Sequence, residues 1–453
     1  MARTARRSHT CSTTLTSCRR STAPRSSARP RCRSSSPDRW WTSFVSVLGR
    51  ETFAALRHRE FRLLWAGQAG ASQAWWMDQV AQGWLMYNLT NSPVQLGLVQ
   101  GIQAIPILVL SPLAGGVADR YPRKQQVVVA QMLAGAMYVV LALLIVTNRI
   151  QPWHVYAMAV VMAMVQAFHQ PARAAMVADA VPPGHLTNAI GLNSLAFNVA
   201  RSTGPALAGV IIAALGTASC YVVQAMCYVL ATVWTLSLRP TPGSATSGHV
   251  GRGSSFGRSI VEGFAFSWRN EVVRPALLIA MGASLLIMPF MTLLPVFARD
   301  LLGVGATGQG ALLTAMGIGA MCSAILVASF GDRLPRGWLM LGGVTVYGLG
   351  VVAFAASTSF RLSLTLMMIV GVAHVSSYAL VQTVIQTYSP SALRGRTMAV
   401  FHMASVVVTL GSMLAGTLAS LAGARWATAA MGAAGVLLTI AIGATLPHAR
   451  RIR

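Results

Sequence analysis

Charged residues are scarce in this sequence. Only 10% of its 453 residues are Asp, Glu, Lys or Arg, whereas 54% are hydrophobic. A soluble domain carries about 25% charged residues. The deficit excludes an ordinary soluble globular protein and indicates that most of the chain faces lipid. At about 20 residues for each crossing, the length allows roughly twelve membrane spans with short loops and a tail.

Acidic residues are the scarcer kind of charge, with 10 Asp and Glu against 35 Lys and Arg and a net charge of +25. A nucleic-acid-binding protein would gather that positive charge on a folded soluble face. Here thirteen of the 35 basic residues precede residue 60, and most others lie in short stretches between apolar runs. We therefore expect no nucleic-acid partner and assign the basic residues to loops on the cytoplasmic side of a membrane.

Motifs for metal binding and catalysis are also missing. The six cysteines show neither metal-ligand spacing nor a disulfide framework. No Gly-x-x-x-x-Gly-Lys loop for nucleotide binding occurs, and no grouping of nucleophile, base and orienting residue is visible. The sequence predicts no metal, no cofactor and no enzyme activity.

The apolar runs predict an all-α membrane protein, because runs this long exclude a barrel. Residues 1–60 are rich in Arg, Ser, Thr and Pro and cannot form a core. They are either a disordered tail or sequence ahead of the true start, and the second interpretation is favoured because span-like sequence begins abruptly near Phe53. Twelve spans follow, at about 63–88, 94–118, 125–147, 153–176, 188–214, 217–237, 275–298, 307–330, 338–357, 362–386, 397–421 and 425–446.

These spans form two six-helix halves, 61–238 and 275–446, with a basic tail at 447–453. Between the halves, 239–274 begins as a Pro/Gly/Ser-rich linker and ends in a short amphipathic segment, Ser259–Asn270, that we expect to lie at the membrane surface. The loops richest in Lys and Arg alternate with loops whose only basic residues are Arg149, Arg299, Arg361 and Arg425. Both termini are therefore predicted to be cytoplasmic.

An internal repeat relates the two halves. Residues 115–124 read Gly-Gly-Val-Ala-Asp-Arg-Tyr-Pro-Arg-Lys, and residues 331–336 read Gly-Asp-Arg-Leu-Pro-Arg at the corresponding place. A second echo pairs Pro-Gly-His-Leu at 183–186 with Pro-Ser-Ala-Leu at 390–393. Two matches in register indicate duplicated halves.

The repeated loop resembles the motif of the major facilitator superfamily, over roughly residues 55–448. Pro122 replaces the usual Gly, and Ala328 stands where the second copy would begin with Gly. In that family the aspartates contact helix starts of the other half when the cytoplasmic side is closed, so Asp119 would meet the helix near Thr397 and Asp332 the one near Thr187. The residues that match the motif and its second copy are Gly115, Asp119, Arg120, Arg123, Lys124, Asp332, Arg333 and Arg336.

Residues 186–209, with 84–92 and 393–396, resemble the enterobactin-exporter-like, or transmembrane secretion effector, group of that superfamily. The exporter signature is carried by Gly191, Gly204, Pro205 and Gly209, although Ala200 and Ala208 replace glycines. The resemblance implies a monomeric bacterial inner-membrane exporter of small molecules that works by alternating access. An importer and a non-transporting membrane sensor remain as alternatives.

Ionisable residues inside the spans are candidates for function, since a charge in mid-membrane costs about 2.5–3.5 kcal/mol. Asp78 could couple transport to protons, or it could pair with a neighbouring helix. Arg201 could attract an anionic substrate or pair with Asp78. His169 and His374 could carry protons or could be hydrogen-bonding packing residues.

Polar residues are concentrated in the first and tenth spans, which in the family line a central cavity. Gln73 and Gln79 belong to the first span and Gln382 to the tenth, whereas the seventh span contributes Met and Phe. One polar wall and one Met/Phe wall would suit amphipathic or aromatic small molecules. The expected partners are such a substrate, protons and the lipid bilayer.

Overall fold

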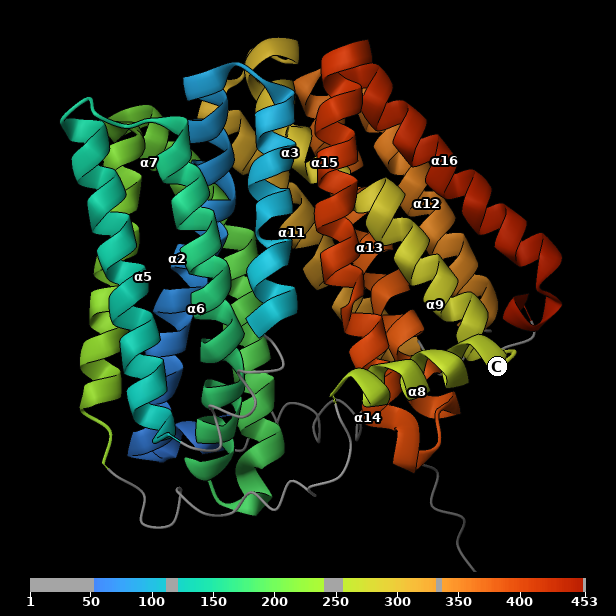
Figure 1. The fold of residues 1–453 in the computed structure, drawn as a ribbon, viewed down its shortest axis with the longest axis horizontal. Helices are drawn as coiled ribbons and strands as arrows, with labels where there is room; N and C mark the ends of the chain where they lie inside the picture. The colour runs from blue at the N-terminus through green and yellow to red at the C-terminus, as the bar shows by residue number, and fades with distance from the viewer. Residues whose placement is uncertain (1–52, 111–120, 240–255, 331–335, 451–453) are drawn as a thin grey trace, which may run out of the picture. The chain divides into compact units, whose positions relative to one another are not determined.

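The protein is described by a computed structural model that covers residues 53–110, 121–239, 256–330 and 336–450 (Figure 1). Within these ranges the regular structure is helical and contains no β-strand. The main helices are α2 (Arg59–Thr90), α3 (Pro93–Ile102), α5 (Arg123–Val146), α6 (Pro152–Asp179), α7 (Leu186–Leu236), α8 (Phe256–Arg269), α9 (Val273–Gly282), α10 (Leu294–Val296), α11 (Gly305–Phe330), α12 (Arg336–Ala356), α13 (Phe360–Tyr388), α14 (Ser391–His402), α15 (Ala404–Ala422) and α16 (Ala424–Thr445).

Nine helices among the described residues are long and apolar enough to cross a membrane, which confirms an all-α membrane protein. One of them, Pro183–Leu236, has 54 residues, far more than the about 20 that one crossing needs. It turns at Gly216, where φ is 85°, a left-handed conformation that glycine adopts without strain. Two further helices, α2 and α6, have 32 and 28 residues but are not among the nine.

Burial explains how α2 can be long yet comparatively polar. It packs along both arms of α7, which lie on either side of Gly216, and it also contacts α3, α6, α10 and α11. The second arm passes close to Gly67, where a Cβ would make an ordinary contact of 3.5 Å with the carbonyl oxygen of Ala231. Because neighbouring helices screen α2 from lipid, its polar side chains avoid the cost of contact with an apolar solvent.

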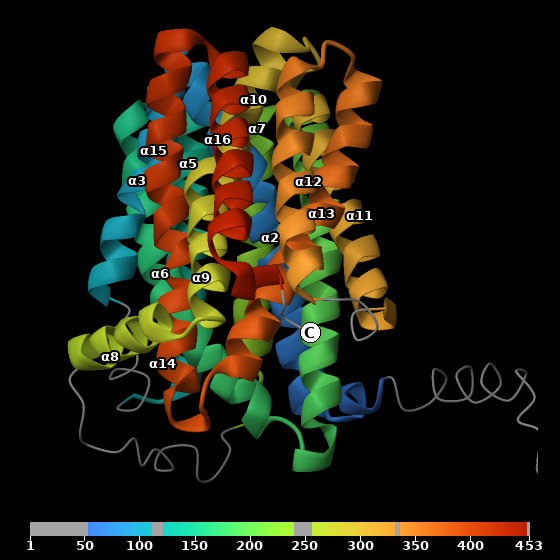
Figure 2. The ribbon, with the colours of Figure 1, turned by 90° about the vertical axis from the view of Figure 1, so that its right-hand side faces the viewer.

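In two places, a helix that precedes α8 packs against a helix that follows it. The helices α3 and α15 lie side by side (Figures 1 and 2), and α7 packs against α11. Both contacts bring backbones together at glycine: a Cβ at Gly97 would lie 2.5 Å from the Ser412 carbonyl oxygen, and one at Gly209 would lie 2.7 Å from that of Ala306. Small residues allow this approach between membrane helices.

These close contacts lie near one end of the helices. Gly97 follows Thr90 at the end of α2 by a few residues, and Gly209 precedes the Gly216 turn. We call this side, where α2 ends and α11 begins, the Thr90 end. The opposite side, which carries Arg123, Lys124 and Arg396, is called the basic end.

At the basic end, α8 packs against α14 through an ion pair between Glu262 and Arg396. It coincides with the amphipathic segment expected at Ser259–Asn270. Val261, Phe264 and Trp268 are at least half exposed along one face of α8, and the last two rings stack.

We predict that Gly209→Val lowers the free energy of unfolding by about 1–3 kcal/mol, because the new side chain overpacks the α7–α11 contact. Reversible unfolding in SDS would measure the change. Gly191→Val is the matched control: it adds the same side chain to the same helix, where nothing lies within 4 Å of a new Cβ. Equal destabilisation by the two substitutions would contradict the prediction.

Candidate functional site

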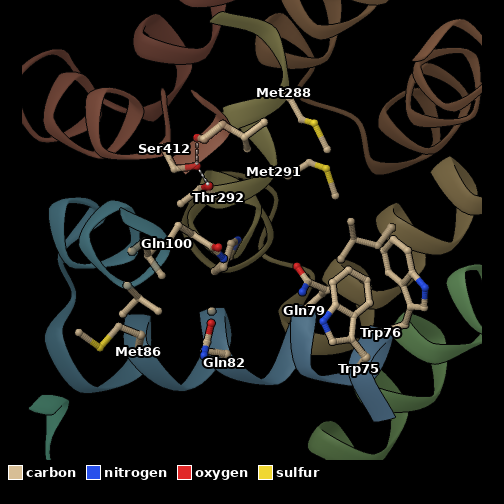
Figure 3. A pocket seen from close by; sticks show the side chains of 16 residues that line it. Trp75, Trp76, Gln79, Gln82, Met86, Gln100, Met288, Met291, Thr292 and Ser412 are labelled. Carbon is tan, nitrogen blue, oxygen red and sulfur yellow. Dashed lines mark hydrogen bonds between the residues drawn. The ribbon is translucent and has the colours of Figure 1, made fainter. Parts of the chain in front are cut away.

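A pocket lies between α2, α3, α15 and the broken segment that follows α9 (Figure 3). Its walls carry amides, indoles and thioethers and no charged side chain. Thr292 donates a hydrogen bond of 2.9 Å to Ser412 and so ties two of its walls together. The lining residues are Trp75, Trp76, Gln79, Gln82, Gly83, Met86, Leu96, Val99, Gln100, Met288, Met291, Thr292, Pro295, Leu313, Val408 and Ser412.

Irregular backbone forms one wall of this pocket. After α9 the chain makes a π-helical turn at Ala283–Ile287, a 3-10 stretch at Met288–Leu293, α10, and a second π-helical turn at Phe297–Leu301. Prolines at 289 and 295 have no N–H to donate. Inside a membrane such backbone is tolerated where it lines a cavity or is buried in protein, and π-helical turns are frequent at functional sites.

A cationic cluster adjoins the pocket through Trp76. The guanidinium carbon of Arg201 lies 5.5 Å from the centre of the Trp76 ring, and Arg201 Nη2 lies 3.5 Å from His374 Nδ1. The His374 ring is 5.1 Å from that of Tyr347, whose buried hydroxyl has no hydrogen-bond partner within the described ranges. No acidic residue in the described part of the chain pairs with Arg201.

Asp78 lies on a different face of α2. Its carboxyl group is buried and within electrostatic range of Tyr138, Tyr221 and Tyr228, on α5 and the second arm of α7. The pairing of Arg201 with Asp78 that the sequence left open is therefore not formed. Several buried polar atoms here have no hydrogen-bond partner among the described residues, namely Asp78 Oδ1, Gln131 Oε1, Tyr138 Oη, Tyr221 Oη and Gln224 Oε1.

Of the other residues predicted to line the cavity, the structure places one in the pocket lining and the rest outside it. Gln79 lines the pocket, but Gln73 does not: its side-chain oxygen accepts a hydrogen bond of 3.0 Å from Thr203. His169 is buried beside Arg173 on α6. Gln382 is half-buried on α13 and lies outside the pocket lining.

Part of the repeated loop motif fastens helices at the basic end. Arg123 forms an ion pair of 2.7 Å with Asp179 at the end of α6. Lys124 Nζ donates to the carbonyl oxygens of Leu236 and Leu238, at 2.7 and 2.6 Å, which places a cation at the negative end of α7. Arg336 begins α12. Gly115, Asp119, Arg120, Asp332 and Arg333 lie outside the described residues, so the contacts predicted for both aspartates remain predictions.

Members of the Gly-Pro segment lie in different surroundings. A Cβ at Gly204 would lie 2.6 Å from Cβ of Trp76, so this glycine lets α7 press against the pocket wall. Pro205 packs against Gly310 of α11, and Gly209 contacts the same helix. No described residue lies within 4 Å of a Cβ added at Gly191.

The sequence did not predict a polar cluster that lies at the Thr90 end. Tyr87 donates a hydrogen bond to Asp300, and the Arg299 guanidinium lies 4.2 Å from the centre of the Tyr87 ring. Arg299 also donates to the side chains of Asn88 and Asn91, at 3.2 and 2.5 Å. The adjacent Arg–Asp pair at the end of an apolar run was the available signal, but its partners are about 210 residues away in sequence. We call these five residues the Thr90-end latch.

The fold is that of known membrane transporters. A solved structure of the nucleoside transporter NupG superimposes with a TM-score of 0.71 at 13% identity, covering 85% of this chain and 99% of that one. An inward-facing bacterial homologue of the lysosomal transporter Spinster superimposes with a TM-score of 0.68 at 16% identity, covering 89% and 99%. At such low identity the likeness concerns the fold alone.

The profile of the transmembrane secretion effector family matches residues 50–451. The chain belongs to this family of major facilitator transporters, which confirms the resemblance found in the sequence. A curated relative, the multidrug efflux pump Tap of Mycolicibacterium fortuitum, is 26% identical over 381 residues, which are 82% of this chain and 92% of that protein. The staphyloferrin A transporter of Staphylococcus aureus is 30% identical over 166 residues, 36% of this chain and 41% of that protein.

We predict that Lys124→Met lowers the free energy of unfolding by about 1–2 kcal/mol, because two carbonyl groups at the end of α7 lose a charged donor. Reversible SDS unfolding is again the measurement. Arg361→Gln, which neutralises an exposed cation at the start of α13, should leave stability nearly unchanged. An unaltered stability of Lys124→Met would show that the two hydrogen bonds do not hold α7.

Proposed function

We propose that the protein exports small amphipathic molecules across the bacterial plasma membrane by alternating access, driven by protons. Its family and the efflux function named for Tap support transport in this direction. The pocket carries the proposal: it combines amides with indoles and thioethers and no charge, a lining that suits molecules with both polar and apolar surfaces.

The proposed topology has twelve crossings in two halves, 61–238 and 275–446, joined by 239–274. The turn at Gly216 supports counting α7 as two crossings, and the lengths of α2 and α6 support one each. The basic end would face the cytoplasm, because Lys and Arg accumulate on that side of a membrane. The exposed apolar face of α8 would then lie at the cytoplasmic lipid surface.

Alternating access requires a site between two bodies that close on one side at a time. Residues that line the pocket come from both halves, and the α3–α15 and α7–α11 contacts lie toward the Thr90 end. In the proposed cycle these contacts and the Thr90-end latch close the outer side while substrate binds from the cytoplasm. They separate when the substrate is released outside.

Asp78 is our proposed proton carrier. A buried carboxyl group without an ionic partner is more stable when protonated, and Oδ1 of Asp78 has no hydrogen-bond partner among the described residues. Asp78 and Gln79 are neighbours on α2 but face the tyrosines and the pocket respectively. A tilt or rotation of this one helix would therefore connect protonation with the shape of the pocket.

Efflux from intact cells tests this function. Cells loaded with a panel of fluorescent amphipathic compounds should lose at least one compound faster when they express the protein. A protonophore and the substitution Asp78→Asn should each reduce that efflux to the background of cells without the protein. Glu271→Gln, which neutralises an exposed carboxylate, is the matched control and should retain efflux. Energy-dependent accumulation of the compounds would reverse the proposed direction, and full efflux by Asp78→Asn would assign coupling to another residue.

The Thr90-end latch makes a second test possible. Gln100→Cys places a thiol in the pocket, and a membrane-impermeant maleimide applied outside the cell should modify it slowly. Adding Arg299→Gln should raise that rate by about fivefold, because a partly exposed charged cluster contributes up to about 1 kcal/mol to the closed state. The same protein with Gln100 intact corrects for native cysteines. An unchanged rate would show that the cluster does not hold the outer side closed.

A further inference from the structure

The least compensated charge beside the pocket is the guanidinium of Arg201. We propose that Arg201 and Tyr347, with His374 alongside, bind an anionic group of the transported molecule, such as a carboxylate or sulfonate, while its apolar part occupies the pocket. This inference rests on the proposed export function and specifies the chemical class of its substrate.

The donors in this cluster suit an anion. Arg201 presents a planar set of N–H groups that match the oxygen atoms of a carboxylate, sulfonate or phosphate. The nearby Tyr347 is 1% exposed, and its hydroxyl has no hydrogen-bond partner in the part of the chain that the structure describes. His374 contacts both residues and can donate or accept. An anion between these side chains would accept hydrogen bonds that the described residues do not accept.

Acidic residues elsewhere do not neutralise this cluster. Asp78 is buried among tyrosines on another face of α2. Each of the other acidic residues in the described ranges has a basic partner of its own, in the pairs Glu60–Arg59, Asp179–Arg123, Glu262–Arg396, Glu271–His448 and Asp300–Arg299. Arg201 is therefore a cation in contact with the pocket-lining Trp76 that no acidic residue among the described ones pairs with.

Trp76 connects the two parts of the proposed site. Its ring lines the pocket and also lies 5.5 Å from the Arg201 guanidinium. The pocket volume is about 140 Å³, less than the roughly 300–1,000 Å³ of sites that enclose a drug-sized ligand. It can hold one apolar or aromatic group of a larger molecule, whose anionic group would then reach past Trp76 to Arg201.

Binding by two fluorescent probes tests the charge preference. Full-length protein in lipid nanodiscs would be titrated with anilinonaphthalene sulfonate, an aromatic anion, and with ethidium, an aromatic cation, and empty nanodiscs would be subtracted. The wild type should bind the anion more tightly than the cation. Arg201→Gln should weaken anion binding about tenfold or more, the size expected for a lost charge-assisted hydrogen bond, without weakening ethidium. Arg201→Lys should retain part of the affinity.

Two further variants separate recognition from general damage. Tyr347→Phe removes only the hydroxyl and should weaken anion binding severalfold, whereas Arg361→Gln removes a cation far from the pocket lining and should change neither probe. All variants should keep the wild-type melting temperature within a few degrees. Preferential binding of ethidium by the wild type, or equal loss of both probes in Arg201→Gln at an unchanged melting temperature, would overturn the proposal.

The binding result and the efflux result are independent. Arg201-dependent anion binding without efflux from cells would support the anion site and contradict the export function. Efflux of cationic compounds that Arg201→Gln does not affect, together with no anion binding, would support export and contradict the anion site.

Discussion

Close backbone contact at the Thr90 end, between helices that precede α8 and helices that follow it, is the constraint on which the rest of the structure depends. Gly97 against Ser412 and Gly209 against Ala306 permit approaches that any larger side chain would block. Lipid supplies no hydrophobic drive for helices to associate, so packing of small residues and polar bonds must hold them. The pocket lies between α2, α3, α15 and the broken segment that follows α9.

Polar residues in this protein serve separate purposes in separate places. Amide side chains line the pocket, Asp78 lies near tyrosines of α5 and α7, and Arg201 lies on the other side of Trp76. Each group is screened from lipid by neighbouring helices, which lowers the cost of placing it at membrane depth. The separation also allows protonation and substrate binding to act on α2 from different faces.

Some features of the site could be predicted from the sequence and others could not. Gln79 and the Met-rich seventh span follow from polarity and from the family resemblance. Only two prolines in the sequence indicated that the helix becomes irregular around Met288. No local pattern indicated that Asp78 points away from Arg201. The Thr90-end latch joins residues about 210 positions apart, and neither side carries a periodic signal. Such pairings depend on how the helices cross in space. The local pattern of residues along one helix does not determine that crossing.

The sequence by itself determined that this is an all-α membrane protein of the major facilitator type, because long apolar runs leave only helices possible in lipid and because its loop motif occurs twice. It also identified Asp78 and Arg201 as costly intramembrane charges. Only the tertiary structure decided that these two charges do not pair, that Trp76 lies between Arg201 and the pocket, and that Gly204 and Gly209 have close neighbours while Gly191 has none. The physical reason is that one helix presents several faces, and which neighbour each face meets depends on packing across the whole bundle.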